Sequence, residues 1–219
     1  MVTKAIFWDN DGVLVETEQL YFEATRDVLA EVDIDLTPAL YKELFLIQGR
    51  GAWHLVAEKG FSADEQERMR VDRNNRYSRG LERTPPLVDG VRDVLQALHG
   101  KYVMGCVTSS RKDHFDLIHR ETGLLQYFDF IITASDVTRV KPDPEPYRLA
   151  VSRTGFAPSE CVAIEDSARG LEAANAAGIR CLVVPTSLTR GSAFPGAQRV
   201  LDRMEDVLPV LARPVSSAV

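Results

Sequence analysis

The chain has 219 residues, of which 45% are hydrophobic and 26% are charged, so it can bury a substantial core and is not a disordered sequence. Its formal net charge of −6 at pH 7 provides no basic surface for nucleic acid or for an anionic membrane. No apolar stretch approaches the roughly 20 residues that span a bilayer. We therefore expect a globular protein with neither nucleic-acid nor membrane partners.

The sequence also favours a cytoplasmic location. Residues Met1 to Lys4 lead directly into an apolar run and lack a signal-peptide pattern. The cysteines Cys106, Cys161 and Cys181 each lie beside an apolar run, which indicates buried, reduced thiols. Histidine or cysteine partners at the spacing that a zinc site needs are absent from the sequence.

The first predicted element is a strand, and a helical stretch follows it. The apolar run Ala5-Ile6-Phe7-Trp8 favours a strand over residues 4–8. The helical patterns that follow cover residues 17–31, 38–45, 52–58 and 63–81. We interpret the charged run Glu65 to Arg83 as a solvated helix face. Residues 17–83 are therefore expected to form an all-helical domain inserted after the first strand.

From about residue 87 onward, short apolar runs alternate with helical patterns. The predicted strands cover residues 101–107, 128–132, 161–164 and 180–184. The predicted helices cover residues 88–98, 111–122, 145–154 and 168–177. This alternation is typical of βαβ units and a parallel sheet with right-handed crossovers. We expect an α/β, Rossmann-like parallel sheet core built from residues 1–16 and 84–219.

Polar side chains follow four of the predicted strands. In chain order they are Asp9 and Asp11, then Thr108, Ser109 and Ser110, then Lys141, and finally Glu165 and Asp166. Ligands of open parallel sheets bind outside the carboxyl ends of the strands. The four segments are therefore expected to converge on one edge of the sheet.

The chemistry of such a cluster is narrow. Four neighbouring carboxylates cannot all stay ionised without a cation, and oxygen ligands alone favour Mg²⁺. Lys141 could hold both a nucleophile and a transferred phosphoryl group. The hydroxyl of Thr108 and backbone N–H groups near Ser109 and Ser110 could add donors for phosphate. These features indicate phosphoryl transfer, which depends mainly on positioning and charge stabilisation.

The same segments carry a resemblance to a known family. They are Asp9-Asn10-Asp11-Gly12-Val13, Val107-Thr108-Ser109, Lys141-Pro142-Asp143-Pro144 and Glu165-Asp166-Ser167. In this order they resemble the four motifs of the haloacid dehalogenase (HAD) superfamily, in the β-phosphoglucomutase-like branch. The resemblance covers nearly the whole chain. It implies that residues 17–83 are the helical cap domain of that branch.

The resemblance implies two catalytic residues. Asp9 would be the nucleophile that forms an aspartyl-phosphate. Asp11 would be the general acid/base, which protonates the leaving oxygen and then activates water. The dehalogenases that gave the family its name lack this second aspartate, so we do not expect halide displacement.

The resemblance also implies which residues bind the metal and the phosphate. The ligands of Mg²⁺ would be Asp9, Asp11 through its backbone carbonyl, Glu165 directly or through water, and Asp166. The phosphate-binding residues would be Thr108, Ser109 and Lys141. With these residues all present, a non-catalytic binding protein that has kept the fold is disfavoured.

The helical insertion would select the substrate, and two positions in it are informative. The β-phosphoglucomutases carry a histidine at the position that counting from the nucleophile assigns to Tyr21. The turn Gln48-Gly49-Arg50-Gly51 offers Arg50 as a substrate contact, although a solvated surface turn is the alternative. We therefore expect a monomeric, Mg²⁺-dependent phosphatase of a small phosphorylated metabolite, with sugar phosphates as the expected substrate class. A β-phosphoglucomutase-type phosphomutase is the alternative.

Overall fold

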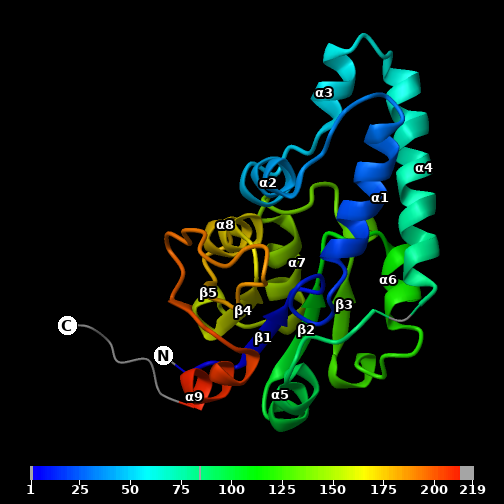
Figure 1. The fold of residues 1–219 in the computed structure, drawn as a ribbon. Helices are drawn as coiled ribbons and strands as arrows, with labels where there is room; N and C mark the ends of the chain where they lie inside the picture. The colour runs from blue at the N-terminus through cyan, green and yellow to red at the C-terminus, as the bar shows by residue number, and fades with distance from the viewer. Residues whose placement is uncertain (1, 84, 213–219) are drawn as a thin grey trace.

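A sheet of six parallel strands lies at the centre of the described part of the chain (Figure 1). The computed structural model describes residues 2–83 and 85–212. The strand order is β3-β2-β1-β4-β5-β6, so β1 is central and the chain crosses over on both sides of it. The strands are β1 (Ala5–Trp8), β2 (Val103–Val107), β3 (Phe130–Ile132), β4 (Cys161–Glu165), β5 (Arg180–Val183) and β6 (Arg199–Val200). The predicted α/β, Rossmann-like parallel sheet is confirmed.

Helices cover both faces of this sheet. The longer ones are α5 (Val91–Leu98), α6 (Lys112–His119), α7 (Glu145–Thr154), α8 (Ala168–Ala176) and α9 (Val207–Ala212). Short 3-10 turns are η2 (Leu125–Tyr127), η3 (Ala134–Asp136), η4 (Pro158–Glu160) and η5 (Met204–Asp206). In β1, Ile6 and Trp8 belong to one hydrophobic cluster, whereas Ala5 and Phe7 belong to the other. Because neighbouring side chains point to opposite faces, a strand covered on both sides is continuously apolar.

Helices alone are found between Thr17 and Arg83. They are α1 (Glu18–Ala30), α2 (Pro38–Tyr41), the π-helical turn η1 (Lys42–Ile47), α3 (Trp53–Glu58) and α4 (Ala63–Leu81). Figure 1 shows α1 and α4 side by side, beyond one end of the sheet. A separate hydrophobic cluster, which includes Leu29, Tyr41 and Val56, stabilises this part of the chain.

The interpretation of the charged run 65–83 as a solvated face is wrong for one side of α4. Arg73, Tyr77 and Leu81 are buried. They are four residues apart, so they share one face of the helix, and α4 contacts α1. Only the other side of this helix is solvated.

Two observations bear on the predicted environment of the protein. Cys106, Cys161 and Cys181 are buried and unpaired, as predicted. Among the described helices, none combines the length and the apolar character needed to cross a membrane.

Candidate active site

The register of the central strands brings two carboxylates to the same edge of the sheet. Trp8 of β1 pairs with Cys106 of β2 on one side and with Ile164 of β4 on the other. The next residues, Asp9 and Glu165, therefore leave neighbouring strands at the same level. The Asp9 N–H donates to the Ile164 carbonyl at 3.0 Å, which continues the ladder up to the carboxylate.

A buried ammonium group joins these two carboxylates. Lys141 Nζ lies 2.8 Å from Asp9 Oδ1 and 2.7 Å from Glu165 Oε1, and it donates to the Val107 carbonyl at 2.7 Å. The Tyr147 hydroxyl donates to the same Glu165 oxygen at 2.5 Å. All three donors of the ammonium are therefore used, and its position relative to Asp9 is fixed.

Glycine at position 12 allows Asp166 to approach this edge closely. Gly12 has a φ of +81°, and a Cβ there would lie 2.5 Å from Asp166 Oδ2. A side chain at this position would therefore be strained and would displace the carboxylate. The glycine of the first motif makes room for the aspartate of the fourth.

Asp11 is held by donors from three segments. Its Oδ2 accepts from Ser110 Oγ at 2.6 Å, from Asn10 Nδ2 at 3.2 Å and from Thr108 Oγ1 at 3.3 Å. Its Oδ1 accepts a short hydrogen bond from the Thr17 hydroxyl, which precedes α1. Asp11 thus contacts both the sheet edge and the start of the helical insertion.

The electrostatics of the cluster indicate that it can accommodate a cation. Carboxylate oxygens of Asp9, Glu165 and Asp166 all lie within 4.8 Å of one another. Burial and the neighbouring Glu165 charge raise the pKa of Asp9 to about 7, and burial beside Asp9 raises that of Asp166 well above its ordinary range. Burial alone would lower the pKa of Lys141, but the charges of Asp9 and Glu165 raise it. One ammonium group is not enough to neutralise three buried carboxylates.

One carboxylate oxygen of the cluster makes no hydrogen bond with the described residues. Glu165 Oε2 is buried and has no hydrogen-bond partner in the described structure. The three carboxylates supply oxygen donors only, which is the donor set that Mg²⁺ prefers. These residues therefore fit a magnesium ion.

The cluster opens into a cavity of about 360 Å³ between the sheet edge and the helical insertion. The sequence-predicted residues that line it are Asp9, Asp11, Thr108, Ser109, Lys141 and Asp166. The Ser109 hydroxyl is buried and lacks a partner among the described residues, so it is free to donate. Glu165 is fully buried behind Lys141.

Arg50 does not join the other predicted site residues. It is exposed and is not part of the cavity lining. Its position corresponds to the alternative interpretation of this segment, a solvated surface turn.

Arg73 of α4 is a site residue that sequence reasoning missed. Its guanidinium lies 4.5 Å from the centroid of the Tyr21 ring and 5.7 Å from that of Trp53. It donates to Asn74 Oδ1 at 2.9 Å and to the Tyr21 hydroxyl at 2.5 Å. It is only 7% exposed, and no carboxylate of the described residues lies within ion-pair distance of it. The four-residue spacing of Arg73, Tyr77 and Leu81 is the signal that could have identified this face.

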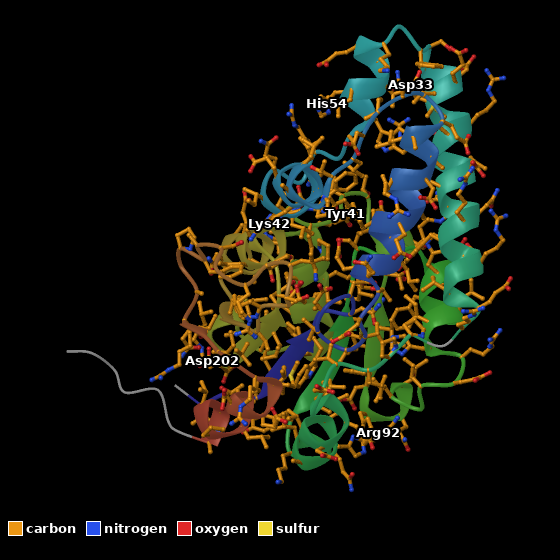
Figure 2. All side chains as sticks on the ribbon, in the orientation of Figure 1. Asp33, Tyr41, Lys42, His54, Arg92 and Asp202 are labelled. Atoms are coloured by element: carbon orange, nitrogen blue, oxygen red, sulfur yellow. The ribbon has the colours of Figure 1, made fainter. Side chains whose placement is uncertain are left out.

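Glu18 is a second missed residue, on the wall formed by α1. Tyr41, labelled in Figure 2, donates a short hydrogen bond from α2 to the Glu18 carboxylate. Burial raises the pKa of Glu18 to about 7, although the Tyr41 hydrogen bond opposes the rise. His114 of α6 also lines the cavity, with Nε2 3.1 Å from Ser78 Oγ.

Comparison with known proteins decides the family. The family model described as haloacid dehalogenase-like hydrolase matches residues 6–184. The chain belongs to this family. The predicted HAD membership is thereby confirmed, and the motifs at Asp9, Thr108, Lys141 and Glu165 lie within the matched region.

Several HAD relatives match over most of their length. The phosphorylated carbohydrates phosphatase of Thermotoga maritima is 33% identical over 215 residues, which are 95% of this chain and 98% of the relative. The validoxylamine A 7'-phosphate phosphatase of Streptomyces hygroscopicus subsp. limoneus is 41% identical over 189 residues, which are 84% of this chain and 86% of the relative. A crystal structure of CbbY from Rhodobacter sphaeroides in complex with xylulose-(1,5)bisphosphate is similar with a TM-score of 0.78 at 27% identity, covering 93% of this chain and 95% of that one.

These comparisons confirm the predicted enzyme class. The family is one of hydrolases, and the T. maritima and S. hygroscopicus relatives are both named phosphatases. The chain is a phosphoric monoester hydrolase of the HAD family.

Proposed function

We propose that this HAD hydrolase is a Mg²⁺-dependent phosphatase of a small phosphorylated carbohydrate and that it works through an aspartyl-phosphate on Asp9. The observation that carries the proposal is the buried contact of Lys141 with Asp9 and Glu165, next to Asp166. The T. maritima relative is named for phosphorylated carbohydrates, which supports the substrate class.

The metal ion would be held by carboxylate oxygens of Asp9, Glu165 and Asp166. Their mutual repulsion and the unpartnered Glu165 oxygen support this assignment. The Asp11 backbone carbonyl remains a further predicted ligand. When bound, Mg²⁺ would neutralise the carboxylates and draw charge from the phosphoryl oxygens.

The first half-reaction transfers the phosphoryl group to the enzyme. A carboxylate oxygen of Asp9 attacks phosphorus, and the bond from phosphorus to the carbohydrate oxygen breaks. Asp11 gives its proton to that oxygen, so the carbohydrate leaves as an alcohol. Lys141 and the hydroxyls of Thr108 and Ser109 would stabilise the negative charge on the transferred group.

The second half-reaction returns the enzyme to its starting state. Asp11, now a carboxylate, removes a proton from water while the water oxygen attacks phosphorus. The bond between phosphorus and Asp9 breaks, which releases inorganic phosphate and restores both aspartates. Residues 17–83 would act as the cap that excludes bulk water during the first step.

Hydrolysis is favoured over the mutase alternative by the surroundings of Tyr21. Its hydroxyl accepts a hydrogen bond from Arg73, and burial raises its pKa. The β-phosphoglucomutases carry a histidine at this position that takes part in substrate-linked cap closure. This chain instead carries a tyrosine whose hydroxyl is bound to Arg73, so it lacks the histidine of the mutase type of closure.

The cavity wall opposite Asp9 supports a carbohydrate substrate. Tyr21 and Tyr77 present aromatic rings, against which the C–H faces of a sugar can pack. Arg73 and Asn74 add hydrogen-bonding groups beside them. A volume of about 360 Å³ is at the lower end of the range for small-molecule sites, which suits a sugar phosphate.

The test is phosphate release from a panel of phosphorylated metabolites, each with Mg²⁺ and with EDTA. The panel contains β-glucose 1-phosphate, pentose and triose phosphates, phosphoglycolate and nucleotides. Mg²⁺-dependent release from sugar phosphates is the expected result. Conversion of β-glucose 1-phosphate to the 6-phosphate without release would establish the mutase alternative instead.

A pair of variants on α4 tests the substrate wall. Arg73→Met is expected to raise KM for the best sugar phosphate by about tenfold, because it removes a buried charged donor from the cavity. Arg79→Met is the matched control, since Arg79 is exposed on the same helix and outside the cavity lining. Equal KM values for the two variants would exclude Arg73 from substrate binding. A monomeric state and a cytoplasmic location remain predictions.

A further inference from the structure

A series of buried hydrogen bonds leads from α6 to the loop that carries Asp9 and Asp11. Asn10 is fully buried, and its Oδ1 lies 2.7 Å from Nε2 of His119, a residue 109 positions away in the sequence. His119 Nδ1 lies 2.9 Å from Thr122 Oγ1. At the other end, Asn10 Nδ2 donates to Asp11 Oδ2 at 3.2 Å.

The positions of the protons in this series follow from the Asn10 amide. Its NH₂ group must face the Asp11 carboxylate, because the opposite orientation would place two oxygens against each other. Asn10 Oδ1 then accepts from His119 Nε2–H, so Nδ1 carries no proton and accepts from the Thr122 hydroxyl. Thr122 Oγ1 in turn accepts from the Leu124 N–H at 3.3 Å. Every donor therefore points toward Asp11.

The backbone of Asn10 organises the same loop. Its carbonyl accepts from the N–H groups of Val13 at 3.2 Å, Leu14 at 2.8 Å and Val15 at 3.2 Å. A change in the position of Asn10 would therefore move the whole turn that follows the nucleophile, and Asp11 with it.

We propose that His119 and Asn10 form a positioning pair for Asp11. The imidazole N–H fixes the Asn10 amide, and the amide N–H orients the Asp11 carboxyl group for proton transfer to the leaving oxygen. This inference rests on the acid/base role of Asp11 in the proposed function. An apolar pair could fill the same buried space without burying any polar group, so filling space does not by itself require these two side chains. Thr108 and Ser110 also donate to Asp11, so loss of the pair should weaken its action without abolishing it.

The test compares two leaving groups. The sugar phosphate that the wild type hydrolyses fastest needs a proton on its leaving oxygen, whereas p-nitrophenolate leaves without one. Asn10→Leu and His119→Leu are expected to lower kcat/KM for the sugar phosphate by about tenfold, a part of the ~100- to 10,000-fold that general acid catalysis supplies. For p-nitrophenyl phosphate the decrease should be less than about twofold, because phosphorylation of Asp9 then needs no acid.

Further variants separate positioning from stability. Asn10→Leu combined with His119→Leu removes both polar groups, so its urea unfolding should be closer to wild type than that of either single variant. The double variant should nevertheless keep the selective decrease in kcat/KM for the sugar phosphate. His119→Gln keeps an N–H donor and should regain part of the rate, while His99→Leu, an exposed histidine, should leave the kinetics unchanged.

Two results would overturn the positioning role. One is a decrease in kcat/KM that is equal for the two substrates in the single variants, because a general loss of folded enzyme would produce it. The other is a double variant with wild-type kcat/KM for the sugar phosphate. Asp11→Asn is the reference variant, because it removes the general acid itself. Absence of any phosphatase activity in the wild type would instead refute the proposed function.

Discussion

Replacement of Glu18 by glutamine would measure the cost of a charge in the cavity wall. Glu18 lies in the first turn of α1, is partly buried and accepts a hydrogen bond from Tyr41. Burial raises the pKa of its carboxyl group from an ordinary value of 4.5 to about 7. Glutamine has the same shape and keeps an oxygen for the Tyr41 hydroxyl, but it carries no charge at any pH.

The sign and size of the effect follow from proton linkage. The folded protein keeps the Glu18 proton up to about pH 7, whereas the unfolded chain releases it near pH 4.5. The stability that this proton provides is thus complete below pH 4.5 and is lost as the pH rises through 7. At pH 8, a pKa rise of this size lowers the free energy of unfolding by about 3 kcal/mol relative to a carboxyl group whose pKa does not change on folding. Water in the cavity reduces the penalty, so we expect Glu18→Gln to be more stable than wild type by about 1–2 kcal/mol at pH 8.

The assay is urea unfolding at pH 5, 6.5 and 8 in buffer with EDTA, followed by circular dichroism. The advantage of Glu18→Gln should grow with pH and should be small at pH 5. Glu16→Gln is the control, because it removes the same charge from an exposed residue two positions away. A gain that is equal at pH 5 and pH 8, or a loss of stability at pH 8, would refute the reasoning.

Three further predictions concern the carboxylate cluster. Asp9→Asn should abolish phosphate release while leaving the circular dichroism spectrum unchanged; residual turnover above about 1% of wild type would contradict the nucleophile assignment. Lys141→Met should lower the free energy of unfolding at pH 8 by about 3–5 kcal/mol, because it leaves two buried carboxylates unpaired; urea unfolding measures this, and a change below about 1 kcal/mol would show that the ion pairs matter little. Addition of Mg²⁺ at about 100 times its dissociation constant should stabilise the wild type by about 2.7 kcal/mol, as measured by thermal unfolding, and Asp166→Asn should lose most of this gain. Equal stabilisation of both proteins would place the metal elsewhere.

Local sequence patterns determined strands β1 to β5 and most of the polar edge at their carboxyl ends. The predicted strands at 4–8, 101–107, 128–132, 161–164 and 180–184 correspond to β1 to β5, because each is a short apolar run bounded by polar or turn residues. Parallel strands also share a direction, so polar residues that follow them must meet at one edge. The convergence of Asp9, Thr108, Lys141 and Asp166 could therefore be predicted without coordinates.

Other elements carry no local signal of this kind. Arg199 and Val200 of β6 are exposed, so this edge strand shows neither an apolar run nor an alternation. The helix predicted at 38–45 is α2 followed by the π-helical turn η1, which ends at Ile47. Such a change of helical pitch is not encoded by hydrophobic periodicity.

The tertiary structure alone decided which polar residues of the helical insertion line the cavity. Arg50 was the sequence candidate because glycines flank it, yet it is exposed, while Arg73 is buried within a charged helix. The bond between Asn10 and His119 likewise joins residues 109 positions apart. Strand periodicity and motif order are properties of neighbouring residues, so the sequence determines them. The burial of a charge and the pairing of distant side chains depend on how the helices pack against the sheet, and only the folded chain specifies that packing.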